Sequence, residues 1–376
     1  MNSRSIPAVF MRGGTSKALM FHARDLPPDR DDWAPIFLRA MGSPDPYGRQ
    51  LDGMGGGVSS LSKVCVIAPS LRDDADVDYS FVQVLINEAR VDYRGNCGNM
   101  LAAVGPFAIE EGLVPAQGAQ AAVRIHNTNT GKLIHATFAL QDGRAREDGD
   151  LAIPGVAGTA APIRLDFIEP GGATTGKLLP TGRVIDELQV AGVGVVQASQ
   201  VDAGNAAVFV RAADVGMTGT ELPDAIERDA SLMTRLQAIR EAASVAMGIA
   251  PTLEDARRIA VVPYIAIVSP PQDARTLTGE MLGADAMDLT ARVIASGQPH
   301  RALPLTVSLC TAVAARITGS LVHAAACSGG SALRIGMPSG VLTLDAEVER
   351  DAAGWCARRG SFYRTARRLF KGEVFV

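Results

Sequence analysis

The chain has 376 residues, and its 47% hydrophobic and 20% charged residues describe a globular rather than a disordered protein. A formal net charge of −4 without a basic stripe argues against nucleic-acid binding as the main activity. The longest apolar run, 261–268, is too short to span a bilayer, and residues 1–10 lack a signal-peptide core. We therefore expect a cytoplasmic protein without membrane contact, and the length favours two domains.

The cysteine and histidine patterns indicate no cofactor or metal. Five cysteines form no CxxC pair and are odd in number, and the five histidines show no metal-binding spacing. Asp45 and Asp52 stand in turns, where an isolated Asp is more often a local cap than a metal ligand. The Gly-rich runs lack the Lys-Ser/Thr ending of a phosphate loop. We expect no metal, no cofactor and free thiols.

Two donor-rich turns come early in the chain. The first is formed by Arg12, Thr15, Ser16 and Lys17, together with two glycines. The second, 52–62, is rich in Gly and Ser and leads into an apolar strand predicted over 63–69. Lys63 begins this strand; burial would lower its pKa and make the amine a base near neutral pH. The alternative is a surface lysine whose stem covers its apolar neighbours.

Cys97 lies directly ahead of a predicted buried helix that reaches residue 111. A thiol in the first helical turn faces unpaired backbone N–H groups and the positive end of the helix dipole, which favour a thiolate and an anionic ligand. Small or polar neighbours let a ligand approach the backbone closely; they are Asn96, Gly98, Asn99 and the following Met100. The alternative is an inert core cysteine.

Several segments of the first half recur in the same order in the second. The matching ranges are 13–26 with 202–215, 63–69 with 264–270, 98–111 with 303–318, 123–125 with 333–335, and 131–133 with 340–342. This order predicts an α+β protein of two pseudo-symmetric domains, 1–183 and 184–376, each a curved β-sheet wrapped around a central helix. The boundary follows the Pro-Thr-Gly turn at 180–182.

The duplication has a consequence for ligand binding. If both central helices point their N-termini into a shared cleft, two positive dipole ends meet there and suit a polycarboxylate. In the second half the segment before the helix reads Gln-Pro-His-Arg-Ala over 298–302, so we expect His300 and Arg301 where the first half has Cys97. This disfavours symmetric chemistry by two thiols.

Seven segments carry a resemblance to a known family. They are 11–17, 41–45, 50–56, 62–64, 96–99, 338–340 and 364–369. In these motifs the chain resembles the PrpF-type isomerases of the diaminopimelate epimerase-like fold, which include 2-methylaconitate cis-trans isomerase, methylitaconate Δ-isomerase and 4-oxalomesaconate tautomerase. The resemblance covers nearly the whole chain. It implies the same helix-centred double fold and cofactor-independent proton transfer on an unsaturated di- or tricarboxylate.

At residue level the resemblance implies that Lys63 and Cys97 are the catalytic pair and that the 12–16 turn binds substrate carboxylates. Loss of an allylic proton gives a delocalised dienolate; its return at the far carbon moves the double bond, and its return after rotation interconverts cis and trans forms. We assign Lys63 as the base and Cys97 as the acid or a substrate-holding group, with the reverse left open. Carboxylate contacts are also expected from His300, Ser339 and Gly340.

Other interpretations stay open from the sequence. Members of the family that the chain resembles carry His before Pro-Ser-Gly, where this chain has Met337. If that His contacts the substrate, the substrate specificity of this chain differs from theirs. A two-thiol amino-acid racemase or epimerase shares the fold, but the chain lacks a cysteine near 300. A non-catalytic carboxylate-binding protein would need neither Lys63 nor Cys97. The substrate stays open among methylaconitate, aconitate, methylitaconate and an oxalomesaconate-like acid, with the 47–50 run closer to the methylaconitate type. A homodimer is the default assembly.

Overall fold

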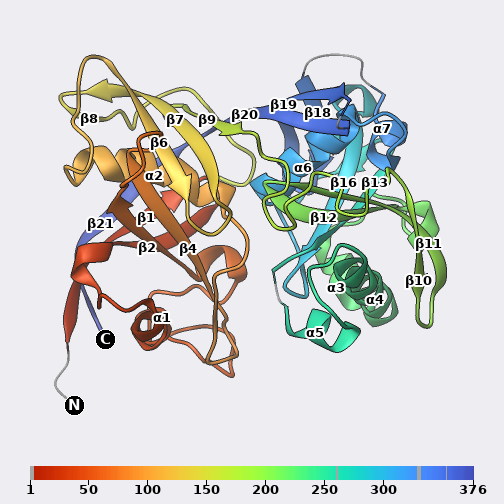
Figure 1. The fold of residues 1–376 in the computed structure, drawn as a ribbon, viewed down its shortest axis with the longest axis horizontal. Helices are drawn as coiled ribbons and strands as arrows, with labels where there is room; N and C mark the ends of the chain where they lie inside the picture. The colour runs from red at the N-terminus through yellow and green to blue at the C-terminus, as the bar shows by residue number, and fades with distance from the viewer. Residues whose placement is uncertain (1–3, 260, 328–331, 353) are drawn as a thin grey trace. The chain divides into compact units, whose positions relative to one another are not determined.

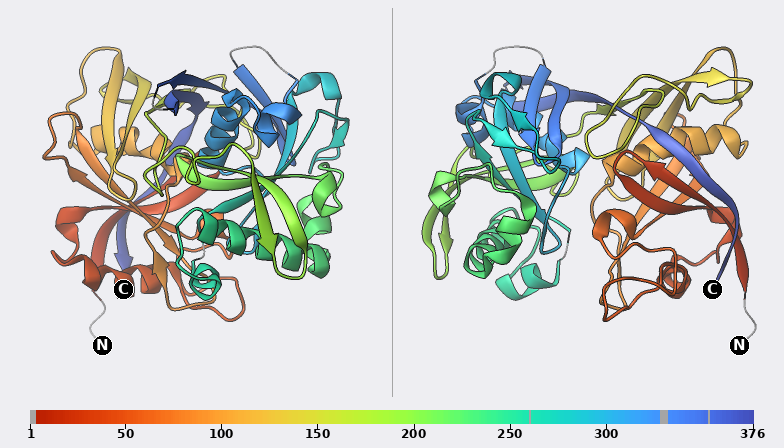
Figure 2. Two further views of the ribbon diagram at one scale, coloured as in Figure 1. Left: turned by 45° about the vertical axis from the view of Figure 1, so that its right-hand side comes forward. Right: turned by 180° about the vertical axis from the view of Figure 1, so that it is seen from behind.

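The computed structural model describes residues 4–259, 261–327, 332–352 and 354–376 (Figure 1). These residues form two compact units: unit 1 runs to Asp166 and includes Tyr363–Val376, and unit 2 is Phe167–Phe362. The internal division falls at 166/167, whereas the expected boundary is 183/184, and in addition the end of the sequence returns to unit 1. Strand β21 (Ala366–Phe375) pairs antiparallel with β1 (Ser5–Gly13) along its whole length (Figure 2).

Unit 1 is a curved sheet around helix α2 (Gly98–Glu110). Its strands pair in the order β21–β1–β2–β3–β4–β6–β7, with β2–β3 and β4–β6 parallel and the other pairs antiparallel. Helix α2 is buried over nearly all of its length and contacts β1, β2, β3, β6, β7, β8 and β21. The remaining strands are β2 (Ser16–His22), β3 (Lys63–Pro69), β4 (Val77–Val84), β5 (Val91–Asp92), β6 (Gln120–Asn127), β7 (Lys132–Gln141), β8 (Arg144–Ala145) and β9 (Ile163–Ile168).

Helix α1 (Trp33–Met41) lies on the other side of this sheet from α2 (Figure 1). Its Phe37 belongs to an apolar cluster that also contains Val64 and Val66 of β3. Because successive side chains of a strand point to opposite faces, Lys63 and Cys65 of β3 lie on the face turned away from α1. This alternation places Lys63 on the inner side of the sheet, where α2 lies.

Unit 2 repeats the architecture. Its strands pair in the order β10–β11–β12–β13–β16–β18–β19–β20, again with two parallel pairs, β12–β13 and β16–β18. Helix α6 (Leu305–Arg316) is the buried central helix, and α4 (Ala230–Ala246) packs on the other face of the sheet. The strands are β10 (Asp186–Val190), β11 (Gly194–Ala203), β12 (Asn205–Arg211), β13 (Tyr264–Ser269), β14 (Ala274–Arg275), β15 (Met281–Leu282), β16 (Leu289–Ala295), β17 (Gln298–Pro299), β18 (Ala332–Met337), β19 (Gly340–Asp351) and β20 (Gly354–Arg364). The short helices are α3 (Pro223–Arg228), α5 (Leu253–Arg258) and α7 (Leu321–Ala325).

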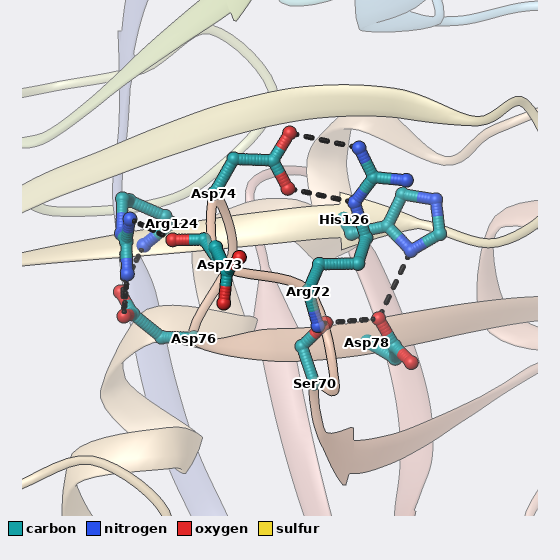
Figure 3. Close-up of polar contacts among 8 residues, drawn as sticks. All are labelled: Ser70, Arg72, Asp73, Asp74, Asp76, Asp78, Arg124 and His126. Atoms are coloured by element: carbon teal, nitrogen blue, oxygen red, sulfur yellow. Dashed lines mark hydrogen bonds and ion pairs between the residues drawn. The ribbon is translucent and has the colours of Figure 1, made fainter.

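Each unit has an equivalent arginine–aspartate contact at its second parallel strand pair, and we call this contact the buttress of the unit. In unit 1 the backbone N–H and the guanidinium of Arg124 donate to Asp76, and its Nη1 also donates to the carbonyl of Asp73 (Figure 3). In unit 2 Arg334 makes the same set of bonds to Asp288 and the carbonyl of Asp285. Together with the matching strand order, this confirms the predicted fold of two pseudo-symmetric helix-centred sheets.

Within the described ranges, none of the helices combines the length and the apolar character that crossing a bilayer requires.

Candidate active site

The β1–β2 hairpin lies directly on the first turn of α2. A Cβ on Gly13 would come within 2.6 Å of the Asn99 carbonyl oxygen, and one on Gly14 within 2.2 Å of Asn99 Oδ1. Gly14 also has a φ of 50°, so glycine is required there for both backbone conformation and space. The Asn99 side chain completes the contact by donating from Nδ2 to Thr15 Oγ1 at 3.1 Å. These contacts fix the hairpin against the helix.

The hairpin brings Ser16 to the thiol of Cys97. Cys97 is the N-cap of α2 and is 8% exposed; its Sγ donates to Ser16 Oγ at 3.9 Å. The neighbouring Asn96, Gly98 and Met100 are buried in the same turn. An N-terminal helical turn presents backbone N–H groups and the positive end of the helix dipole. The thiol therefore stands where a carboxylate or a developing enolate is stabilised.

Lys63 is buried on the inner face of β3. Its Nζ donates to Gln83 Oε1 at 2.5 Å and lies 5.0 Å from the centre of the Phe81 ring. Burial lowers the pKa of Lys63, whereas negative charge on Cys97 or Cys65 would raise it. The structure thus places Lys63, Cys97 and Ser16 together in unit 1.

Two further buried groups connect β3 to the Cys97 turn. Cys65 Sγ donates to the Tyr79 hydroxyl at 4.0 Å, and that hydroxyl donates to the Cys97 carbonyl oxygen at 3.5 Å. Burial raises the pKa of both Cys65 and Tyr79. Both groups are therefore neutral near pH 7, so neither supplies a negative charge that would hold the Lys63 amine as ammonium.

The structure does not bring Lys17 into this group. Lys17 Nζ lies 5.5 Å from the centre of the Phe10 ring, and Phe10 belongs to the apolar cluster beside α1. Lys17 is directly opposite Arg12 in the hairpin, so the two share the outer face. Arg12 Nη1 donates to the carbonyl of Gly14 and to Thr365 at 3.0 Å, so this guanidinium nitrogen ties the hairpin to the segment before β21.

Arg364 is a site residue that the sequence did not single out. It is 5% exposed, and its Nε donates to Asn99 Oδ1 at 3.3 Å. Burial lowers its pKa to about 10, so the guanidinium is still charged near neutral pH. The sequence contained it only within the 364–369 motif, and its placement beside α2 depends on the return of the chain to unit 1.

The residue that caps the second central helix is not the one that the sequence predicted. Helix α6 starts at Leu305 with Pro304 as its N-cap, so Pro304 and not His300 occupies the place of Cys97. The reason is that His300 continues the strand pairing: its backbone N–H donates to the Val293 carbonyl at 2.9 Å. The expected correspondence between the His-Arg pair and Cys97 is therefore wrong.

The remaining predicted substrate contacts lie in unit 2. Ser339 lies in the turn between β18 and β19, and Gly340 begins β19; Ser339 Oγ is buried with no hydrogen-bond partner among the described residues. Met337, at the position where a His was expected in relatives, is buried and accepts the Leu303 N–H through Sδ at 3.4 Å. Among the described residues, no group of three or more His, Cys, Asp or Glu side chains is placed to hold a metal.

The chain matches the family model of the PrpF protein over residues 3–376. It is 43% identical to the 3-methylitaconate isomerase of Eubacterium barkeri over 375 residues, covering 99% of this chain and 97% of the relative. It is 38% identical to the 2-methyl-aconitate isomerase of Shewanella oneidensis, covering 99% and 96%. It is 39% identical to the 4-oxalomesaconate tautomerase of Pseudomonas putida, covering 100% and 97%.

Solved structures agree with these relatives. A crystal structure of methylitaconate-delta-isomerase has a TM-score of 0.81 and 42% identity, covering 100% of this chain and 96% of the other. A hydroxyproline epimerase from Agrobacterium vitis, at 13% identity, has a TM-score of 0.58 over 99% of this chain and 93% of the other and shows a common fold alone. The chain belongs to the PrpF family and is an isomerase.

Proposed function

We propose that this isomerase moves a proton on an unsaturated di- or tricarboxylate, with Lys63 and Cys97 as the catalytic pair. The observation that carries the proposal is a buried, hydrogen-bonded Lys63 on β3, the strand that the Tyr79 hydroxyl links through Cys65 to Cys97 at the N-cap of α2. An amine with a lowered pKa and an acid beside N–H donors are the groups that a 1,3-proton shift requires. Matched relatives are named as isomerases of 3-methylitaconate and 2-methyl-aconitate, which supports this substrate class.

In the proposed reaction the neutral Lys63 amine removes the allylic proton. The electron pair of the broken C–H bond spreads into the adjacent double bond and carboxylate as a dienolate. The thiol of Cys97 then gives a proton to the far allylic carbon, which moves the double bond, and proton exchange returns both groups to their starting states. The burial of Lys63 beside a neutral partner supports its assignment as the base. In the reverse assignment a Cys97 thiolate removes the proton and the Lys63 ammonium returns one.

Charge on the substrate is proposed to be held by three kinds of group in unit 1. The free N–H groups of the first α2 turn and the Ser16 hydroxyl donate to a carboxylate beside Cys97. Arg364, bonded to Asn99 of that turn, supplies a positive charge. Roles of His300, Ser339 and Gly340 in substrate binding stay predictions.

A panel experiment in deuterated water tests the function. The purified protein is incubated with 3-methylitaconate, 2-methylaconitate, trans-aconitate and 4-oxalomesaconate, and NMR locates the incorporated deuterium. We expect deuterium at an allylic carbon of at least one acid, together with the shifted or isomerised double bond. Exchange only at the α-carbon of an amino acid would favour a racemase instead. Raised thermal stability with these acids but no exchange would favour a carboxylate-binding protein.

A further inference from the structure

The side-chain amide of Gln83 has a fixed orientation next to Lys63. Its Nε2 donates to the carbonyl oxygens of Ser62 at 2.8 Å and Ser59 at 3.1 Å. Carbonyl oxygens only accept, so the amide nitrogen must face them and the amide oxygen must face Lys63. The bond from Lys63 Nζ to Gln83 Oε1 at 2.5 Å is then a donation by the amine.

The carbonyls that orient Gln83 belong to an ordered turn. Ser62 is fully buried, and its Oγ donates to the Val84 carbonyl at 2.9 Å while accepting from Gln50 Nε2 at 2.7 Å. Gln50 in turn accepts the Gly57 N–H through Oε1 at 3.0 Å. The Gly-rich loop before β3 is therefore the support that holds the amide of Gln83 in place.

We propose that Gln83 is a positioning residue for Lys63: it holds one hydrogen of the amine and brings no negative charge, so that the amine stays available as the base. This inference rests on the proposed function for its catalytic meaning. A neutral amide fixes the rotation of the Nζ hydrogens, whereas a carboxylate in the same place would form an ion pair and keep the lysine protonated. The identity of residue 83 as Gln rather than Glu is thus part of the site.

The charged and titratable neighbours are compatible with this role. The titratable groups on this side of the sheet are Cys65 of β3, Tyr79 of β4, which is bonded to Cys65, and Cys97 at the N-cap of α2, which is bonded to Tyr79 through its carbonyl. On β5, Asp92 is directly opposite Gln83, and its Oδ1 accepts the Arg94 N–H at 2.7 Å. Among the described residues, the hydrogen bond of Lys63 Nζ goes to Gln83 and not to Asp92. Gln83 is the group bonded to the amine.

The first test measures Lys63 directly, without turnover. The chain has five lysines, at 17, 63, 132, 177 and 371, so a protein labelled with [13Cε]lysine gives few signals, and Lys63 is assigned with the Lys63→Arg variant. We expect Gln83→Glu to raise the pKa of Lys63 by about one unit or more. The exposed Gln141 of β7 provides the matched control, and Gln141→Glu should leave the Lys63 titration unchanged. An unchanged Lys63 titration in Gln83→Glu overturns the proposal.

The second test uses the pH dependence of turnover. Because the base must be deprotonated, a raised pKa in Gln83→Glu moves the acid limb of kcat/KM to higher pH, with a loss of roughly tenfold at neutral pH that is recovered at high pH. Gln83→Met removes the acceptor without adding charge, so its rate should fall even at high pH, where the amine is deprotonated, and its acid limb should not move to higher pH. Equal losses without a shift in both variants would mean a structural role only.

The two tests also separate this inference from the function. If no acid in the panel is turned over, the proposed function fails, and the NMR titration still decides whether residue 83 controls the charge of Lys63. If turnover is found but the titration does not move, the function stands and the role of Gln83 is rejected.

Discussion

Helices α2 and α6 occupy the same place in the two units, yet the ends that begin them carry different chemistry. Cys97 caps α2, whereas Pro304 caps α6 and offers neither a thiol nor a backbone N–H. Lys63 begins β3, whereas Tyr264 begins the matching β13. The duplicated chain has therefore kept one scaffold and placed the candidate acid and base in unit 1 alone.

The scaffold contacts, in contrast, are present in both units. The hairpin is bonded to its helix by Asn99 and Thr15 in unit 1 and by Asn205 and Thr306 in unit 2, at 3.1 and 2.7 Å. Here the residue types change but the hydrogen bond between hairpin and helix is retained. Contacts that hold the fold thus recur in both units, while contacts that would hold a reacting molecule do not.

The largest effect is expected at the two strand starts. Lys63→Ala should lower kcat by about 10³-fold or more with the fold intact, because the base is lost. Tyr264→Phe at the matching position should change kcat by a factor of about two to three, since it removes no charge. Steady-state kinetics with circular dichroism checks both. Near wild-type turnover of Lys63→Ala would reject the assignment of the base.

The two buried thiols on the central helices give the next comparison. Cys97→Ser should lower kcat by about 10²-fold with a smaller change in KM, because a hydroxyl is a far weaker acid than a thiol. Cys310 lies within α6, and its Sγ donates to the Val201 carbonyl at 3.3 Å. Cys310→Ala should therefore retain most activity. An unchanged kcat for Cys97→Ser would leave that residue a structural role.

The hairpin glycines give a smaller effect, on stability. Gly14→Ala places a Cβ against Asn99 Oδ1 at positive φ, and we expect a loss of about 2 to 4 kcal/mol in the free energy of unfolding. Gly204 also has positive φ, but its nearest neighbour is Leu309 Cδ2 at 3.2 Å, so Gly204→Ala should cost about 1 kcal/mol. Urea unfolding of both variants measures the difference. Equal losses in the free energy of unfolding would show that the positive φ alone determines the cost of each substitution.

The smallest effect is expected at the paired buttresses. Arg124→Met and Arg334→Met should each lower the free energy of unfolding slightly, and by similar amounts. Burial would raise the pKa of Asp76 and of Asp288, but the hydrogen bonds from the arginines outweigh it and hold both below the ordinary value. A depressed carboxyl pKa gives stability above the ordinary pKa that is lost as pH falls through the folded-state value. The cost of each substitution should therefore shrink below about pH 4, as thermal unfolding at several pH values would show.

The sequence predicted the parts of this molecule that depend on local pattern. The recurring segments predicted the two helix-centred sheets. Cys97 and its small or polar neighbours predicted a thiol at the start of a helix. Which residues lie opposite each other on neighbouring strands could not be predicted from the sequence. Gln83 is bonded to Lys63 because β3 and β4 pair in a register that places the two residues opposite each other, although they are 20 positions apart in the sequence. A polar Gln within the otherwise apolar 81–84 run was the available signal.

The position of Lys17 and the start of α6 differ from what the sequence pattern indicated, and the reasons lie in the local sequence. Lys17 was grouped with Ser16 because they are adjacent, but strand alternation sends neighbours to opposite faces, and Lys17 packs on Phe10. The start of α6 was placed too early because residues 298–302 contain a polar pair, whereas β17 extends the sheet as far as Pro299. In both cases the residue type indicated substrate binding, whereas the course of the backbone determines where the side chain lies.

The return of β21 to unit 1 has a consequence for biosynthesis. A chain made from its N-terminus produces β1 long before its partner β21, so the sheet around α2 lacks an edge strand, and Arg364 and Thr365, until residues 364–375 have been made. The half with the candidate base and acid thus matures after the half without them. A polypeptide that stops before residue 364 would lack both the edge strand and Arg364, and we expect it to be inactive although Lys63 and Cys97 have already been made.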